Sequence, residues 1–303
     1  MKVRIEEFAV GDPSDGPYGI TVAPDGAIWF TLARAGKIGR FVPPDDMRFY
    51  ELPEPGVLPT NIVADSDGVL WFAQSRGNSI GRITPDGGMS FFDLPTAAAH
   101  PYGLWIGYDR ALWFTEMMAD RIGRLSPEGE ITEFPLPLSG GYPSDIVAGP
   151  GRRMWFTLNQ AGAIGSISMS GDVIMHGKTA ENSAPVGIAA KGDSVWFAQI
   201  GSGTIGTCNM GNVVTDYRLW DDDAKPHGIV ADPDDGFWFT SWGSNSVGHI
   251  SDAGSVTSFA IPTEQAEPHG ITLAPDGSVW AALEVGKLLR LQPRDQLQNF
   301  PAE

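Results

Sequence analysis

Residues 17–41 read PYGITVAPDGAIWFTLARAGKIGRF, and this stretch contains the unit that decides the fold. It opens with a Pro-Tyr-Gly-Ile element, continues to an Ile-Trp-Phe-Thr run, and ends in an Ile-Gly-Arg run. Asp-Gly and Gly-Lys turns separate these runs, which are short and rich in β-branched and aromatic residues. Such turns between such runs are typical of antiparallel hairpins. No window has the apolar spacing of an amphipathic helix, so we predict strands throughout.

The unit recurs seven times along the chain. Its first proline returns at intervals of 42 residues, with a single interval of 41, at Pro17, Pro59, Pro101, Pro143, Pro185, Pro226 and Pro268. A period near forty residues is typical of stacked supersecondary units. Each unit contains four strand-like runs, and the nearly continuous apolar character of the Trp-Phe runs indicates that both faces are covered. We therefore predict an all-β fold, a seven-bladed β-propeller of four-stranded antiparallel sheets.

The seven units leave no room for a second domain, so we expect one propeller domain over residues 1–303. A chain of this length buries roughly 75% of the surface that its unfolded form exposes, and it needs no metal or disulfide to fold. Two terminal segments, residues 3–8 and 297–301, both resemble the fourth strand of a blade. Only one of them can complete blade seven and close the ring, and we favour the N-terminal segment.

Charge and cysteine content exclude several classes of function. The formal net charge is −17 and the pI is about 4.5, which disfavours nucleic acid and anionic membranes as partners. The single cysteine, Cys208, excludes an intramolecular disulfide. The chain has no apolar stretch of signal-peptide or transmembrane length. We expect a cytoplasmic protein, and a monomer because a closed propeller gives no reason to invoke a dimer.

Departures from the repeat locate a candidate site. The residue after the first proline is Tyr18 in blade one, His227 in blade six and His269 in blade seven, which are consecutive blades in a closed ring. Equivalent positions at the start of the innermost strands face the axis, so we expect these side chains to converge. Glu267 lies two residues before His269, and Glu284 follows the tryptophan strand of the same blade. The sequence thus predicts two carboxylates beside two histidines.

These residue types suit proton transfer next to a cation. A neutral imidazole accepts a proton near pH 7, and a neighbouring carboxylate stabilises the imidazolium that forms. A second carboxylate could hold Mg²⁺, which prefers oxygen ligands. Two isolated histidines are more often structural, but their convergence with Glu267 and Glu284 favours a functional site. Blade seven also carries Ala281 where the other blades have Phe, and this smaller residue suggests open space at the axial mouth.

Along its full length the chain resembles the virginiamycin B lyase family. The resemblance is carried by GPYGIT at residues 16–21, the Trp-Phe-Thr and Ile-Gly-Arg repeats, KPH at 225–227 and EPHGI at 267–271. It implies seven blades and a Mg²⁺-dependent carbon–oxygen lyase of antibiotic resistance. Such an enzyme linearises cyclic depsipeptides of the streptogramin B type by elimination at the ester linkage, without water.

The resemblance also implies roles for individual residues. These are His269 as general base, Glu284 as the carboxylate that orients it, Glu267 as Mg²⁺ ligand, His227 as second catalytic histidine, and Tyr18 and Trp242 as substrate-binding residues. Next to Trp242, the chain has Ser241 where the family tends to carry a glutamate. Because pocket walls decide which ring fits, this difference leaves the natural substrate open.

The residues leave two other classes of function open. One is a metal-dependent lactonase, although such propellers place more metal ligands near the axis than this sequence does. The other is a noncatalytic propeller that binds a protein or small ligand on its rim loops. A binding propeller does not need His227, His269 and Glu284 together.

Overall fold

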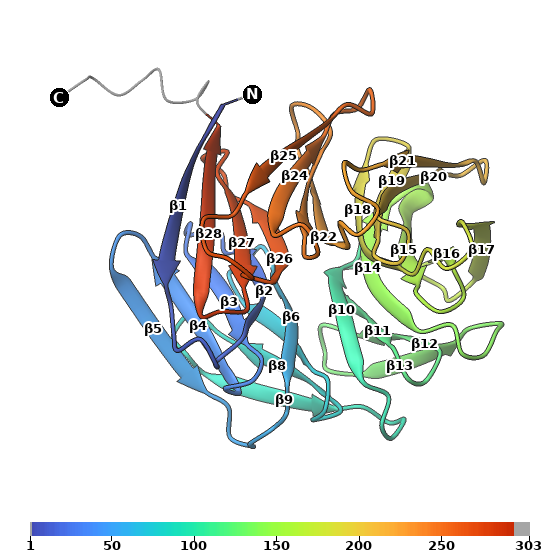
Figure 1. Cartoon of the computed structure of the whole chain (residues 1–303). Helices are drawn as coiled ribbons and strands as arrows, with labels where there is room; N and C mark the ends of the chain where they lie inside the picture. The colour runs from blue at the N-terminus through green and yellow to red at the C-terminus, as the bar shows by residue number, and fades with distance from the viewer. Residues whose placement is uncertain (1, 294–303) are drawn as a thin grey trace.

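A computed structural model describes residues 2–293, and within them 28 strands form seven four-stranded antiparallel sheets. The sheets are arranged in a ring, as Figure 1 shows, and the predicted seven-bladed β-propeller is confirmed. The innermost strands of neighbouring blades contact one another around the axis. In the described residues the one helix is a single 3-10 turn, Pro150–Arg152, and no helix is long and apolar enough to cross a membrane.

From the axis outward, the strands of each blade are as follows. Blade one has β2 (Pro17–Val22), β3 (Ile28–Leu32), β4 (Lys37–Val42) and β5 (Asp46–Glu51); blade two has β6 (Pro59–Ala64), β7 (Leu70–Gln74), β8 (Ser79–Ile83) and β9 (Met89–Asp93). Blade three has β10 (Pro101–Ile106), β11 (Leu112–Glu116), β12 (Arg121–Leu125) and β13 (Ile131–Pro135); blade four has β14 (Pro143–Gly149), β15 (Arg153–Leu158), β16 (Ala163–Ile167) and β17 (Val173–Lys178). Blade five has β18 (Pro185–Lys191), β19 (Ser194–Gln199), β20 (Thr204–Asn209) and β21 (Val214–Arg218); blade six has β22 (Pro226–Ala231), β23 (Phe237–Ser241), β24 (Ser246–Ile250) and β25 (Val256–Ala260). Blade seven has β26 (Pro268–Leu273), β27 (Val279–Leu283), β28 (Lys287–Pro293) and β1 (Val3–Ala9).

The N-terminal strand closes the ring, as expected. Strand β1 pairs antiparallel with β28, from Val3 opposite Pro293 to Ala9 opposite Lys287. The competing segment, residues 297–301, lies outside the described residues, and the single-domain span 1–303 stays a prediction. Because β1 belongs to the first residues of the chain and the rest of blade seven to the last, their pairing ties the two ends of the propeller together (Figure 1).

Packing between neighbouring blades explains the apolar strands. Strand β3 is buried at every residue, and its Trp29 packs against Leu70 and Phe72 of blade two. In six blades the phenylalanine of the second strand lies over the glycine of the Ile-Gly run, as Phe30 does over Gly39. A Cβ atom on Gly39 would meet the Phe30 ring at 2.1 Å, so only glycine fits there. The repeated motif is therefore a packing requirement.

In blade seven the large and the small residue of this pair have changed places. The prediction of open space at Ala281 is wrong. Ala281 lies opposite Leu289, which replaces the glycine of the other blades, and both residues are fully buried. The larger leucine fills the volume that the smaller alanine leaves. A volume-conserving exchange of this kind keeps the density of the core, so it creates no cavity.

Candidate active site

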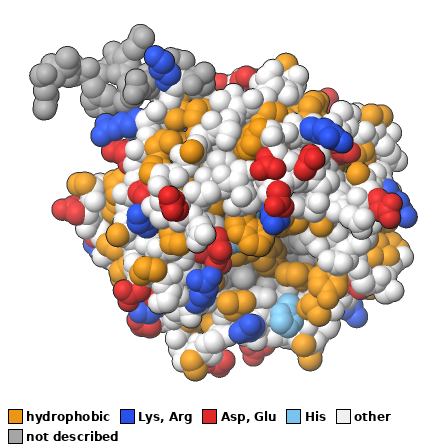
Figure 2. All heavy atoms as spheres, viewed as in Figure 1, with side chains coloured by type: hydrophobic (Ala, Val, Ile, Leu, Met, Phe, Trp, Pro, Cys, Tyr) orange, Lys and Arg blue, Asp and Glu red, His pale blue; other side chains and the backbone are white. Residues whose placement is uncertain are grey.

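The side chains that follow the first proline converge near the axis, as the repeat predicted. Strands β2, β22 and β26 are neighbours, and they bring Tyr18, His227 and His269 together. The Tyr18 and His269 rings stack with centroids 4.5 Å apart, and the two histidine rings meet edge to face at 4.7 Å. Figure 2 shows hydrophobic side chains around a central hollow on the viewed face, with acidic and basic groups scattered around it.

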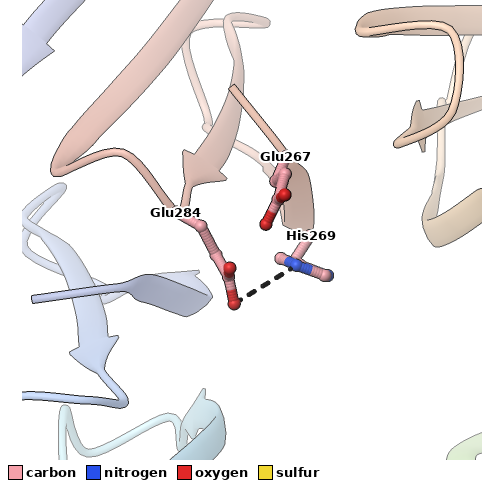
Figure 3. Close-up of side chains that lie close together, drawn as sticks. All are labelled: Glu267, His269 and Glu284. Atoms are coloured by element: carbon pink, nitrogen blue, oxygen red, sulfur yellow. Dashed lines mark ion pairs between the residues drawn. The ribbon is translucent and has the colours of Figure 1, made fainter. Parts of the chain in front are cut away.

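Two carboxylates reach the same point from blade seven. Glu267 precedes β26 and Glu284 follows β27, and the Glu284 N–H donates a hydrogen bond to the Glu267 carbonyl at 3.3 Å. Glu284 Oε1 lies 3.4 Å from His269 Nε2, as the dashed line in Figure 3 marks. Glu267 has a φ of 48°. In every other blade, the residue just before the first proline also has a positive φ. The backbone bend thus belongs to the repeat, and only the side chain distinguishes blade seven.

The two carboxylates have opposite pKa shifts. Burial by itself raises the pKa of Glu284, but hydrogen bonds with His269 and Glu267 and the charge of Arg34 outweigh burial and lower it to about 2. The pKa of Glu267 is raised, chiefly by its hydrogen bond with Glu284 and then by burial. Because like charges this close disfavour double ionisation, Glu284 holds the negative charge and Glu267 retains a proton more readily.

His269 presents one nitrogen to the site and buries the other. The side chain is buried, with 8% of the residue exposed. Nε2 faces Glu284, whereas Nδ1 is buried without a hydrogen-bond partner among the described residues. In the neutral tautomer with its proton on Nδ1, Nε2 has a lone pair that can accept a proton or bind a cation, but not both at once. Once protonated, Nε2 can donate to Glu284.

His227 is neutral at physiological pH. Burial, and then the charge of His269, lowers the pKa of His227 to about 3. Its Nε2 lies 3.4 Å from the Tyr18 hydroxyl, which in turn lies 2.5 Å from the hydroxyl of Tyr102 in blade three. Burial raises the pKa of Tyr18 to about 12, so the phenol stays protonated. His227 and Tyr18 therefore offer neutral hydrogen-bonding groups.

Trp242 forms a wall of the site. Its ring lies 6.0 Å from the His269 ring, it is 38% exposed, and Lys225 Nζ lies 5.7 Å from its centroid. An exposed indole beside a histidine offers a flat apolar surface to a ligand. The structure thus places all six residues expected from the sequence around one point.

A threonine hydroxyl anchors both histidine strands from behind. Thr240 Oγ1 accepts a hydrogen bond from the Gly228 N–H at 2.8 Å and donates one to the His269 carbonyl at 2.7 Å. Thr157 makes the equivalent bridge in blade four, where it donates to the Val186 carbonyl at 2.6 Å. The two hydrogen bonds of this threonine, here called the clamp, therefore recur in the repeat, and in blade six they hold the backbone of His269.

Sequence reasoning missed three polar residues near the axis. Tyr102 occupies the same repeat position as Tyr18, and this equivalence could have identified it. Arg34 forms an ion pair with Glu284. Its one signal in the sequence is that it follows Ala33, the blade-one equivalent of Glu284. Asp145 replaces a glycine that five blades share, and it lines an axial cavity of about 120 Å³ together with Tyr102 and His227. Burial raises the pKa of Asp145 to about 7, against hydrogen bonds from two backbone amides.

The site has the donor atoms for a hard divalent cation. One ligand atom from each of Glu267, His269 and Glu284 lies within 4.8 Å of the others. The hydrogen bond with Glu284, burial and then the charge of Glu284 raise the pKa of Glu267, and a cation bound between the two carboxylates would relieve the same repulsion as a proton. Carboxylate oxygens are the ligands that Mg²⁺ prefers. The residues present therefore fit such an ion.

Comparison with known proteins gives a match over nearly the whole chain. The model of the virginiamycin B lyase family matches residues 3–291. Among curated relatives, the virginiamycin B lyase of Saccharopolyspora erythraea is 58% identical over 41 residues, and this segment spans 14% of this chain and 14% of the relative.

Two solved structures extend the likeness to full length. A streptogramin B lyase superposes with a TM-score of 0.91 at 36% identity, covering 96% of this chain and 97% of that chain. The same TM-score and identity hold for a catalytically inactive virginiamycin B lyase from Staphylococcus aureus, in which a histidine is replaced by alanine, solved with quinupristin. That match covers 96% of this chain and 100% of the other.

Proposed function

This chain belongs to the virginiamycin B lyase family, and on that premise we propose that it is a carbon–oxygen lyase. Its substrates are cyclic depsipeptides of the streptogramin B type, which it opens by base-promoted elimination at the ester linkage. The observation that carries the proposal is the 3.4 Å approach of His269 Nε2 to a Glu284 carboxylate that stays ionised. A buried base beside an ionised acid suits the removal of a proton from carbon.

His269 acts as the general base in this proposal. Nε2 takes the proton from the carbon α to the carbonyl of the ester-bearing residue. The electron pair of that C–H bond forms the α,β double bond, the bond from the β carbon to the ester oxygen breaks, and the oxygen leaves as a carboxylate. No water enters, so the linear product has the mass of the substrate.

Glu284 stabilises the imidazolium that forms on His269. Because the pKa of Glu284 is lowered to about 2, its charge is present throughout the physiological range. A carboxylate at 3.4 Å stabilises the positive charge that the ring gains when it takes the proton.

Glu267, with Glu284 beside it, would hold Mg²⁺. When bound, such an ion supplies a positive charge that stabilises the negative charge developing on the substrate carbonyl oxygen. The carboxylates would supply the oxygen ligands, which would leave Nε2 of His269 for proton removal. Because the pKa of Glu267 is raised by its hydrogen bond with Glu284 and by burial, protons compete with a metal ion for this carboxylate, and the affinity for Mg²⁺ should rise with pH.

The remaining residues hold and orient the substrate. Trp242 offers its exposed ring to an apolar side chain of the depsipeptide, and Tyr18 stacks on His269 and limits the rotation of its ring. His227 gives a neutral imidazole, which can hydrogen-bond an uncharged ester without adding charge. Monomeric state, cytoplasmic location and the absence of nucleic-acid or membrane partners stay predictions from the sequence.

Mass spectrometry of a streptogramin B incubated with the protein and Mg²⁺ tests the proposal. We expect a linear product of unchanged mass, which disappears with a chelator and in His269→Ala. His249→Ala is the matched control, because His249 is equally buried at 8% exposure but lies in β24, where it contacts Trp238. A product heavier by one water would instead indicate the lactonase, and no product with unchanged ligand binding would indicate a binding propeller.

A further inference from the structure

Arg34 reaches the site from a neighbouring blade. It lies in the loop between β3 and β4 of blade one, and its Nη2 donates to Oε2 of Glu284 in blade seven. Oε1 of the same carboxylate faces His269. Glu284 therefore lies between the base and the guanidinium group of Arg34.

The guanidinium has capacity for a second anion. Its side chain is 51% exposed, whereas that of Glu284 is 15% exposed. A guanidinium carries five N–H donors in a planar fork and stays charged at every relevant pH. The structure gives this group one hydrogen-bonded contact to a described residue, the bond to Glu284. The remaining N–H donors are thus available to a second anion while the ion pair persists.

Arg34 lies close enough to the base to reach a leaving group. One carboxylate group and two short contacts separate its Nη2 from His269 Nε2, so the two nitrogens lie within roughly 8 Å of each other. In the elimination the departing oxygen is two bonds from the carbon that loses its proton. A substrate carbon in contact with Nε2 therefore brings the ester carboxyl group within reach of the guanidinium.

A released carboxylate needs such a partner here. It forms beside Glu267 and Glu284, in a chain of net charge −17, and the Mg²⁺ that these carboxylates would hold is assigned to the substrate carbonyl oxygen and not to the leaving group. His227 turns Nε2 toward the Tyr18 hydroxyl and buries Nδ1. The other nearby cation, Lys225, lies over Trp242 and pairs with Asp223. Arg34 is the cation that pairs with Glu284, the carboxylate beside His269.

We propose that Arg34 is a further catalytic residue, which binds the carboxylate released from the ester through the guanidinium donors that Glu284 leaves free. This inference rests on the proposed function, because elimination is what produces that carboxylate. Charge-assisted hydrogen bonds from arginine to carboxylate are strong and directional. Arg34 thereby stabilises the negative charge as the Cβ–O bond breaks and holds the product until it dissociates.

The chain offers a matched control one blade away. Arg76 has the same loop position in blade two, next to Ser75 as Arg34 is next to Ala33, and it has no ion pair with a described residue. The variants to compare are Arg34→Gln, Arg34→Lys and Arg76→Gln. Each is loaded with Mg²⁺, assayed for turnover of a streptogramin B, and titrated with the linear acid product and with its neutral primary amide.

The preference for acid over amide separates an electrostatic role from a structural one. We expect kcat to fall at least tenfold in Arg34→Gln, with partial recovery in Arg34→Lys and less than a twofold change in Arg76→Gln. The preference for the acid should fall at least fivefold in Arg34→Gln alone. Turnover with an unchanged preference in Arg34→Gln would overturn the role of Arg34 and leave the lyase intact. No linear product from the wild-type protein would overturn both.

Discussion

Glu116 is a buried carboxyl group whose replacement should stabilise the protein at neutral pH. It ends β11, it is fully buried, and neither of its oxygens has a hydrogen-bond partner among the described residues. Burial, and then the charge of Glu133, raises the pKa of Glu116 from 4.5 to about 8. The folded protein therefore holds this carboxyl group protonated over a range where the unfolded chain ionises it.

The sign and size of the effect follow from this difference. Between pH 4.5 and 8 the folded state binds the extra proton, so the group's contribution to stability falls as pH rises, by at most about 1.4 kcal/mol per pH unit. At pH 7.5 the accumulated loss is at most about 4 kcal/mol. Glutamine carries no charge, and Gln74 and Gln199 already occupy the equivalent position in blades two and five. Glu116→Gln therefore fits the repeat and removes the loss.

Urea unfolding from pH 5 to 8 measures the prediction. We expect Glu116→Gln to match the wild type near pH 5 and to exceed its free energy of unfolding by on the order of 1–3 kcal/mol at pH 7.5. The control is Glu130→Gln, which removes an exposed carboxylate from the loop just before β13 of the same blade and should show no such divergence. Parallel pH profiles for wild type and Glu116→Gln would refute the reasoning, because they would mean that Glu116 ionises alike in both states.

Three further predictions concern the site and its scaffold. Titration with Mg²⁺ should release protons, seen in calorimetry as heats that depend on the buffer, and Glu267→Gln should abolish this release along with most of the affinity. Thr240→Val should lower kcat at least tenfold, whereas Thr157→Val should leave kcat within twofold of the wild type. Each variant loses the threonine hydrogen bonds and should lose about 1 kcal/mol of unfolding free energy. Equal kcat values in the two variants would show that the Thr240 hydrogen bonds do not position the base. Leu289→Gly should destabilise the protein by about 2–5 kcal/mol in urea unfolding, and adding Ala281→Phe should recover most of it by restoring the pair of the other blades.

The repeat was sufficient to predict the architecture. Seven units of nearly equal length, each with the same turn residues and apolar runs, allow few packings, because every sheet must cover its neighbour. The run predicted at Ile28 to Thr31 forms β3, Ile28–Leu32, and the N-terminal strand completes blade seven. Local turn chemistry and the need to bury both faces of each sheet act within one unit, so they can be read from the sequence.

The repeat also predicted which residues meet at the axis. Equivalent positions in a closed ring face the same opening, and this symmetry brings His227 and His269 together although 42 residues separate them. Glu267 and Glu284 follow from the same alignment, because they are departures within one blade. The sequence therefore identified the histidines and carboxylates of the site, but not Tyr102, Arg34 or Asp145.

The tertiary structure alone decided how those residues interact. Which nitrogen of His269 faces Glu284, that Arg34 crosses from blade one to blade seven, and that Tyr18 reaches Tyr102 depend on side-chain direction and reach. The same is true of Leu289, whose bulk fills the space left by Ala281. A period specifies where each Cα lies in the ring, but contacts between blades depend on packing at full density, where neighbouring side chains fix one another's rotamers.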